Sequence, residues 1–332
     1  MTQTYDIVGI GNAIVDVIAS CDDAFLDHMG IEKGIMQLVE RERAELLYAS
    51  MKERVQTPGG SVANTLAGIG ALGLSCAFIG KVKDDALGEF YATASRRSGT
   101  AFPLHPMSVP LPTSRSMIFV TPDGERSMNT YLGAGADIGS GDVGQIGARV
   151  FASGGILLLE GYLFDKPQGK TAFAEAAARM RAAGGRAAIT ISDPFCAERH
   201  RADFQRLIAK DMDIAIGNAA EWTTLYETDD LDAALREAAS VCDVVACTRS
   251  GEDVWVHSGG ERFAAPVTPQ RVVDATGAGD QFAAGFLYGL SKGRDPETAA
   301  RMGVLCAAEV IGHVGPRPEA SMIEAFREAG LV

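Results

Sequence analysis

The chain has 332 residues, of which 47% are hydrophobic and 22% are charged. These proportions are typical of globular proteins and exclude a largely disordered chain. Lys and Arg number 30 against 43 Asp and Glu, so the formal net charge is −13, and a broad attraction to nucleic acid or to an anionic membrane surface is not expected. The length allows about two ordinary domains, or one large α/β domain with a small appendage.

No apolar run approaches the roughly 20 residues that a membrane-spanning helix needs, and the N-terminal residues carry no basic leader segment. The six cysteines are scattered and form no CxxC pair, which argues against a zinc site and against a disulfide framework. The sequence therefore predicts a cytoplasmic protein that binds neither nucleic acid nor membrane.

Six short apolar segments predict strands that are buried on both faces. They lie at residues 6–10, 76–79, 156–159, 187–191, 214–216 and 244–247. Amphipathic helical patterns follow most of them, at residues 62–72, 86–97, 170–183, 233–239, 279–290 and 296–311, with a last short helix from residue 322. This alternation predicts an α/β fold with a central, mostly parallel sheet flanked by helices.

Several segments of the first 135 residues break this alternation and predict strands of a second, smaller sheet. They are residues 14–20, 34–40 and 101–133, and the last of these contains two strands around the turn Pro122-Asp123-Gly124. No Pro/Ser-rich linker, repeat or low-complexity tract divides the sequence. We therefore expect a single α/β domain over residues 1–332, with the small sheet as a β-subdomain.

The strongest chemical signal is a run of small residues before a helix. Gly277, Ala278 and Gly279 precede an amphipathic pattern, so their backbone N–H groups can converge on an anion at the positive end of the helix. Asp280 follows, and a carboxylate there would repel a phosphate unless it had a chemical task. Phosphoryl transfer to an alcohol requires a general base beside such amides. The alternative is a Gly-rich helix start in which Asp280 only complements the helix dipole.

Two polar positions near the N-terminus interrupt an apolar run. Asn12 and Asp16 are four residues apart, so in an extended chain they point to the same side, where an amide and a carboxylate together suit vicinal hydroxyls. A turn Asn and a strand-end Asp are the alternative. Gly59 and Gly60 permit a close backbone approach to a ligand, and Asn64 lies one turn into the helix that follows.

Two further glycine motifs are not predicted to bind nucleotides. The segment Gly169-Lys170-Thr171 has the end of a P-loop, but the P-loop pattern requires Gly at position 164, where this chain has Phe164. The segment at residues 9–14 begins like a dinucleotide-binding fingerprint, but its third glycine is replaced by Ile14.

Three motifs of this sequence are G-N-x-x-x-D at residues 11–16, G-G-x-x-x-N at residues 59–64 and D-x-x-G-A-G-D at residues 274–280. Their order resembles the ribokinase/PfkB family of sugar and nucleoside kinases. The resemblance covers essentially the whole chain. It extends to residues 218–221, which are similar to the NxxE motif of the family, and to residues 245–251, which are similar to its nucleotide-binding strand and turn.

The resemblance implies a ribokinase-like, Rossmann-type sandwich with a small β-sheet lid. It also implies ATP and Mg²⁺ as cosubstrates, and transfer of the γ-phosphoryl group to a primary hydroxyl. Carried over to this sequence, Asp280 is the base, and Gly277, Ala278 and Gly279 form the anion hole. The residues implied for the acceptor hydroxyls are Asn12, Asp16, Gly59, Gly60 and Asn64. Those implied for ATP are Asn218, Thr248, Ser250 and Gly251, and Asn218 with Glu221 is implied for Mg²⁺, mostly through water.

The sequence departs from the family pattern at two positions. Ala275 stands where Thr is common, and Ala220 stands where an acidic residue is common, but neither change removes a chemical group assigned above. Asp274 and Thr276 resemble residues around a monovalent-cation site of some members, which leaves a requirement for K⁺ open.

Residues 11–17, 122–134 and 160–162 look most like bacterial adenosine-kinase-type members. On that basis Arg126 reaches over the phosphate side from the lid, while Tyr162, Met36 and Leu38 line an apolar slot for a purine. A surface arginine and ordinary core packing are the alternatives for these residues.

The predicted activity is phosphorylation of a ribonucleoside at its 5′-hydroxyl, with adenosine as the expected acceptor, as in purine salvage. One alternative is a kinase of a free sugar such as ribose or fructose. Another is a non-catalytic ligand-binding regulator of the same fold, against which stands Asp280 with its adjacent small residues. A monomer and a homodimer paired through the lid are both compatible with the sequence.

Overall fold

The computed structural model describes residues 4–147 and 150–332, and it contains a nine-stranded and a five-stranded sheet. In spatial order, the larger sheet consists of β14 (Glu261–Ala265), β13 (Glu252–Ser258), β12 (Val244–Arg249), β11 (Ile214–Asn218), β10 (Arg186–Thr190), β9 (Phe151–Glu160), β1 (Tyr5–Ile10), β5 (Cys76–Ile79) and β6 (Thr100–Ala101). The smaller sheet, here called the lid, consists of β3 (Met36–Leu38), β8 (Arg126–Tyr131), β7 (Ser114–Val120), β2 (Ile14–Ser20) and β4 (Val55–Gly59).

The larger sheet is parallel from β12 to β6, and β13 and β14 add an antiparallel edge. β1 lies inside the sheet, with β5 on one side and β9 on the other. The chain first continues to β5 and later returns to β9, so the strand order reverses at β1. In such sheets, ligands bind beyond the carboxyl ends of the strands at the reversal point.

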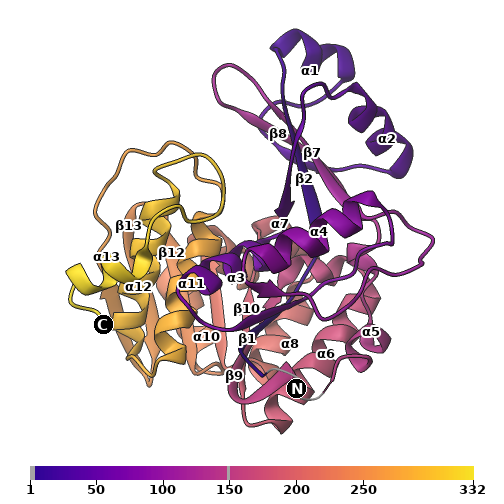
Figure 1. Cartoon of the computed structure of the whole chain (residues 1–332). Coiled ribbons are helices and arrows are strands. Elements are labelled where there is room, and N and C mark those ends of the chain that lie inside the picture. The colour runs from indigo at the N-terminus through magenta and orange to yellow at the C-terminus, as the bar shows by residue number, and fades with distance from the viewer. Residues whose placement is uncertain (1–3, 148–149) are drawn as a thin grey trace.

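Helices cover both faces of the larger sheet (Figure 1). One face packs on α3 (Ser61–Ala71), α4 (Ala86–Arg97), α11 (Ala278–Ser291), α12 (Pro296–Val310) and α13 (Met322–Glu328). The other packs on α5 (Ser140–Gly144), α6 (Pro167–Ala182), α7 (Pro194–Arg199), α8 (Arg201–Asp211), α9 (Ala219–Leu225) and α10 (Leu231–Ala239). Two 3₁₀ helices, η1 (Gly135–Asp137) and η3 (Gly161–Asp165), complete this side, and α1 (Asp23–Met29) and α2 (Arg41–Ser50) belong to the lid.

Burial on both faces explains the continuous apolar strands. In β9, Ile156 and Leu158 belong to one core, whereas Leu157 and Leu159 belong to the other, and all four are fully buried. Alternate residues of such a strand meet different helix layers, so no polar position is tolerated between them. The predicted α/β fold with a mostly parallel sheet and a second small sheet is therefore confirmed.

The lid differs from the prediction at two points. Ala101 was expected at the start of a lid segment, but with Thr100 it forms β6, which pairs with β5 in the larger sheet. The lid also contains β4, which the sequence analysis did not predict. The sequence of β4, VQTPG, lacks a clear alternation and contains Pro58, which is tolerated because β4 is an edge strand.

The lid projects from the rest of the molecule, and Figure 1 shows α1 and α2 at its far end. Its buried residues, among them Val17, Leu47 and Met117, belong to the same core cluster as residues of α3 and α11. The lid therefore shares one continuous apolar core with one face of the larger sheet. None of the helices in the described part of the chain is long and apolar enough to cross a membrane.

Candidate active site

A cavity of about 620 Å³ lies between the lid and the carboxyl ends of the larger sheet. It is bordered by the segment between β1 and β2, the start of α3, the ends of β9, β10 and β11, and the start of α11. The predicted site residues that line it are Asn12, Asp16, Met36, Leu38, Gly60, Asn64, Tyr162, Asn218, Glu221, Gly277, Ala278, Gly279 and Asp280. The structure thus brings together residues from six separate sequence segments.

Asp280 lies in the first turn of α11 with both carboxylate oxygens hydrogen-bonded to α3. Ser61 Oγ donates to Oδ1 at 2.6 Å, and Asn64 Nδ2 donates to Oδ2 at 3.2 Å. Burial raises the pKa of Asp280 to about 6, while these two donors act in the opposite direction. A carboxylate with this pKa is mostly ionised at neutral pH and can accept a proton, which is what a general base requires.

The start of α11 leaves backbone donors unused. Gly277 has φ +81°, so it is the residue that permits the chain to turn into the helix, and a side chain there would also meet Pro316 at 2.6 Å. Within the described chain, the amide of Ala278 donates to Ala275 O, whereas those of Gly279 and Asp280 reach no backbone carbonyl. Such amides at a helix N-terminus suit an anion.

Gly279 keeps this helix start open. A Cβ built on Gly279 meets no atom within 4 Å, so neither packing nor a positive φ requires glycine there. The side chain would instead enter the space of the cavity that Gly279 lines. This arrangement is expected where a ligand approaches the backbone closely.

Asn12 is held by a residue that sequence reasoning missed. Glu160, at the end of β9, accepts from the Asn12 backbone amide at 2.7 Å, from Asn12 Nδ2 at 2.8 Å and from the Val62 amide at 3.2 Å. Burial raises the pKa of Glu160 to about 7, and the bonds from Asn12 and Val62 oppose that rise. The signal in the sequence was an acidic residue that closes an otherwise apolar strand.

Asp16 lies on β2 at the boundary between the lid and the cavity. A Cβ at Gly59 would come within 2.4 Å of its carboxylate, and a Cβ at Gly60, where φ is +99°, would come within 2.4 Å of Asn12 O. The two glycines therefore allow the end of β4 to pass close to both Asp16 and Asn12. Gly59 itself is not among the described residues that line the cavity, and its contact with the acceptor stays a prediction.

Arg126 is paired with an acidic residue of the loop before α11. It begins β8, and its Nη1 forms an ion pair with Asp274 Oδ2 at 3.0 Å. Asp274 also accepts from the Thr276 amide at 2.9 Å and from the Gly315 amide at 3.0 Å. Arg126 thus joins the lid to the loop that precedes α11, although it is not among the described residues that line the cavity.

Asn218 and Glu221 form a reciprocal cap at the start of α9. Asn218 Oδ1 accepts from the Glu221 amide at 2.9 Å, and Glu221 Oε2 accepts from the Asn218 amide at 2.9 Å. Burial raises the pKa of Glu221 to about 7. Both side chains line the cavity, so the cap places a carboxylate and an amide at one wall.

The predicted ATP residues Thr248, Ser250 and Gly251 are outside the described cavity lining. Thr248 pairs with Asn218 in the β11–β12 ladder, so it lies at the same edge of the sheet. Ser250 and Gly251 form the following turn, with φ of +45° and +94°. The roles of Thr248, Ser250 and Gly251 in ATP binding stay predictions, and the structure places Thr248 next to Asn218 at this edge of the sheet.

Acidic residues outnumber basic residues in the cavity lining. Among the described residues that line it, Arg199 is basic and six are acidic: Asp16, Glu160, Asp165, Asp193, Glu221 and Asp280. Arg199 is paired with Asp165, Nη2 to Oδ1, at 3.0 Å. The apolar lining residues include Ile14, Met36, Leu38, Met128, Leu132 and Phe195, and all but Phe195 belong to the lid or its connections.

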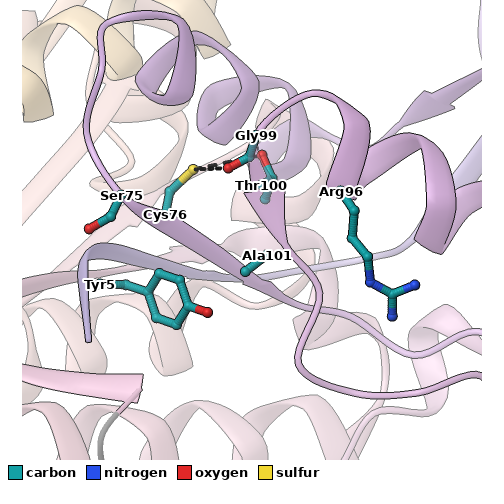
Figure 2. Close-up of a pocket in the computed structure, with 7 residues that line it drawn as sticks. All are labelled: Tyr5, Ser75, Cys76, Arg96, Gly99, Thr100 and Ala101. Atoms are coloured by element: carbon teal, nitrogen blue, oxygen red, sulfur yellow. Dashed lines mark hydrogen bonds between the residues drawn. The ribbon is translucent and has the colours of Figure 1, made fainter. Parts of the chain in front are cut away.

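A second cavity, of about 220 Å³, lies at the opposite end of the larger sheet. Its lining includes Tyr5, Cys76 and Thr100, which begin the parallel strands β1, β5 and β6. Figure 2 shows Tyr5 and Arg96 on either side of Ala101. The amino ends of these strands are remote from the carboxyl ends that form the main site, so the second cavity takes no part in the chemistry considered above.

The fold and the main cavity together define a class of protein. A buried carboxylate next to free amides at a helix start is the arrangement that a phosphotransferase with an alcohol acceptor needs. Residues 31–321 match the family described as pfkB family carbohydrate kinase, and the chain belongs to this family.

Two solved structures are similar over nearly the whole chain. A probable sugar kinase protein from Rhizobium etli CFN 42 is 42% identical, with coverage of 99% of each chain and a TM-score of 0.89. Adenosine kinase from Sinorhizobium meliloti is 47% identical, with coverage of 98% of this chain and 99% of that chain and a TM-score of 0.88. The 5-dehydro-2-deoxygluconokinase of Bacillus licheniformis is 26% identical over 320 residues, which are 93% of this chain and 90% of that protein.

The chain is accordingly a sugar or nucleoside kinase, an enzyme that transfers a phosphoryl group to an alcohol. The names of these relatives differ in the acceptor. The choice between acceptors therefore depends on the residues of the cavity.

Proposed function

We propose that this enzyme transfers the γ-phosphoryl group of ATP to the 5′-hydroxyl of adenosine. The observation that carries the proposal is the combination of Asp16 and Asn12 with an apolar lid surface in one cavity. The two polar residues suit the ribose hydroxyls, and the lid surface with Tyr162 suits a flat base. The named activity of the Sinorhizobium meliloti relative supports this choice.

The charge of the lining favours a neutral acceptor. Among the described lining residues the one cation, Arg199, is paired with Asp165, so no free cation in this lining meets the carboxylate of a sugar acid such as 5-dehydro-2-deoxygluconate. A nucleoside and a neutral sugar need no such partner. The lining therefore argues against the acceptor named for the Bacillus relatives, and it leaves ribose or fructose as the alternative within the same chemistry.

The apolar lining discriminates between a nucleoside and a free sugar. Met36 and Leu38 are 45% and 51% exposed, so the lid leaves apolar side chains open. A base that buries such surface gains about 25 cal/mol per Å². A free pentose presents hydroxyls instead and would leave the lid surface uncovered.

Each polar residue has a role in the proposed reaction. Asp280 accepts the proton of the attacking hydroxyl, and the amides at the start of α11 stabilise charge on the transferring phosphoryl group. The ion pair with Asp274 holds Arg126 beside the loop that precedes α11, where its positive charge also stabilises the negative charge of the phosphoryl group. Ser61 and Asn64 orient the base through their hydrogen bonds.

The residues present also fit ATP with Mg²⁺. The unused amides of α11 suit a phosphate, and the carboxylate of Glu221 and the amide of Asn218 present oxygen atoms of the kind that Mg²⁺ prefers, with water completing the shell. When bound, Mg²⁺ neutralises phosphate charge. Among the described residues, no group of three or more His, Cys, Asp or Glu side chains is placed to hold a metal by itself.

The proposed activity is tested by a screen of ATP consumption with adenosine, ribose, fructose and 5-dehydro-2-deoxygluconate. We expect adenosine to give a kcat/KM at least tenfold above the others, because a few hundred Å² of apolar contact is worth about 2 kcal/mol or more. Tyr162→Leu should raise the adenosine KM, whereas the matched Tyr162→Phe, which keeps the ring and loses the bond to Ser192 O, should change it little. A free sugar that outperforms adenosine would overturn the choice of acceptor.

The remaining expectations stay predictions. They are a single-domain organisation of residues 1–332, a cytoplasmic location, a monomer or a homodimer paired through the lid, and a contribution of K⁺ near Asp274 and Thr276.

A further inference from the structure

Arg317 lies in the segment between α12 and α13, directly beside the candidate active site. Its guanidinium contacts two other segments. Nη2 donates to Pro58 O of β4 at 2.8 Å, and Nε donates to Asn64 Oδ1 of α3 at 3.5 Å. Both acceptors are uncharged oxygen atoms. The cation is therefore half-buried at the junction of three segments, and neither of its hydrogen bonds pairs it with a negative charge.

The segment that carries Arg317 is fixed against α11. Gln281 Nε2 donates to Pro316 O at 2.9 Å and to Asn64 O at 3.0 Å, so one side chain ties this segment to α3. Gly277 packs against Pro316 from the other side. The position of Arg317 is therefore linked directly to the start of α11, where Asp280 lies.

The hydrogen bond to Asn64 has a directional consequence. An arginine can only donate, so the atom of Asn64 that faces it must be the oxygen. The amide nitrogen then faces Asp280 Oδ2, to which it donates at 3.2 Å. If the Asn64 amide were reversed, its oxygen would face the carboxylate and the two would repel. The contact with Arg317 thus selects the productive orientation of Asn64.

The charge of Arg317 acts on a second residue. Burial raises the pKa of Asp16 to about 7, the charges of Arg126 and Arg317 act in the opposite direction, and the charge of Asp280 adds to the rise. Arg126 is already paired with Asp274. Arg317, in contrast to Arg126, donates its two hydrogen bonds to uncharged oxygen atoms, so these bonds do not neutralise its charge.

On these grounds we propose that Arg317 is a positioning residue of the acceptor site: it orients the Asn64 amide toward Asp280, and its positive charge favours the ionised form of Asp16 that would bind the acceptor hydroxyls. The proposal rests on the proposed function, in which Asp280 is the base and Asp16 binds the acceptor. Arg317 itself contacts neither ATP nor the acceptor in this assignment.

The test compares Arg317→Met, which keeps length without charge, with Arg317→Lys, which keeps the charge. The measurement is kcat and KM as a function of pH, with the best acceptor from the screen described above. In Arg317→Met, the acid limb of kcat/KM for the acceptor should move to higher pH, and the value at pH 7 should fall about tenfold for each pKa unit of the shift. The KM for ATP should change by less than about twofold, because the affected groups bind the acceptor.

Arg317→Lys should restore the acid limb. Its kcat should remain reduced, because a lysine does not reproduce the guanidinium bond to Asn64. Arg327→Met is the matched control, since Arg327 is exposed on the adjacent α13 and the substitution removes the same charge. It should leave all parameters at wild-type values.

Two results would overturn the proposal. One is an Arg317→Met enzyme with an unshifted acid limb and an unchanged acceptor KM. The other is an Arg317→Lys enzyme whose acid limb stays displaced as far as that of Arg317→Met, because the charge of residue 317 would then have no influence on the acceptor site. A folding defect is recognised by thermal unfolding of the same proteins, and Arg317→Lys then carries the test. If Asp280→Asn retains turnover, the proposed base is wrong, whatever the Arg317 variants do.

Discussion

Glu160 fixes the orientation of the Asn12 side-chain amide. Its Oε1 accepts from both the backbone amide and Nδ2 of Asn12, so the nitrogen of that amide is directed at Glu160. The opposite atom, Asn12 Oδ1, is buried, and within the described residues no donor reaches it. An unsatisfied acceptor in a ligand cavity is costly unless a ligand donates to it. We infer that a hydroxyl of the acceptor does so.

The first prediction is that Glu160→Gln weakens acceptor binding. The carboxylate oxygens of Glu160 meet three donors, so the NH₂ group of a glutamine must face either Asn12 or Val62. An unmade bond of this kind costs about 1–3 kcal/mol, which corresponds to a rise in acceptor KM of roughly tenfold or more. Steady-state kinetics measure it. Glu175→Gln, on the exposed part of α6, is the matched control, and an unchanged acceptor KM in Glu160→Gln would show that Asn12 does not need this partner.

The second prediction concerns Asp280. In Asp280→Asn, kcat should fall by about 10²–10⁴, because the amide cannot accept the hydroxyl proton. Binding of ATP and acceptor, measured by calorimetry, should change much less. Turnover at the wild-type rate would exclude Asp280 as the base.

The pH profile gives an independent check of the same base. Burial raises the pKa of Asp280 to about 6, and the base must be ionised to act. The wild-type kcat should therefore be constant above that pH and fall with a slope of about one log unit per pH unit below it. Ser61→Ala removes a donor that favours the ionised form, so the fall should begin at higher pH.

The parts of the site that could be predicted from the sequence are those whose chemistry is local. Gly277, Gly279 and Asp280 are nearly consecutive, so the start of a helix at these residues is enough to place unpaired backbone amides beside a carboxylate. The apolar strands were also predictable, because burial on both faces produces a continuous run of apolar residues. Such a run can be recognised without knowing which strand pairs with it.

The rest of the site depends on contacts between distant segments. Glu160 meets Asn12 across 148 residues, and Arg317 meets Asn64 across 253 residues. An acidic residue at the end of a strand and an arginine in a loop can each be noticed in the sequence, but neither indicates which distant residue it contacts. Arg126 was predicted on the phosphate side, but its ion pair with Asp274 depends on how the lid docks. Long-range packing, and not local propensity, places these side chains.

The third prediction is that the ligand-free protein loses stability as the pH rises. Burial raises the pKa of Asp16, Glu160 and Glu221 to about 7 and that of Asp280 to about 6. Between about pH 4.5 and pH 7, the folded state therefore binds more protons than the unfolded state. The free energy of unfolding must then decrease as the pH increases through this window.

Urea denaturation between pH 5 and 8 measures this effect. The total loss should be several kcal/mol, since one pKa unit corresponds to about 1.4 kcal/mol, and part of it will be common to any acidic protein. Glu221→Gln isolates the contribution of one group, and its slope against pH should be smaller than that of the wild type. Equal slopes for the two proteins would contradict the raised pKa of Glu221.

The last prediction uses two glycines that differ only in what surrounds them. Gly279 lies in the first turn of α11 and Gly141 in α5, and a Cβ on either meets no protein atom within 4 Å. Neither has a positive φ. Replacement by alanine should therefore be tolerated at both positions and should stabilise each helix by up to about 1 kcal/mol, because glycine is the poorer helix former.

The two substitutions should differ in their effect on the reaction. Gly279 lines the cavity beside the unused amides of α11, so the methyl group of Gly279→Ala would occupy space that a phosphate needs. We expect a rise in ATP KM and a fall in kcat, each by about tenfold or more, with the fold intact by thermal unfolding. Gly141→Ala should show the stabilisation without the kinetic effect. If Gly279→Ala keeps wild-type kinetics, the start of α11 does not hold the phosphoryl group.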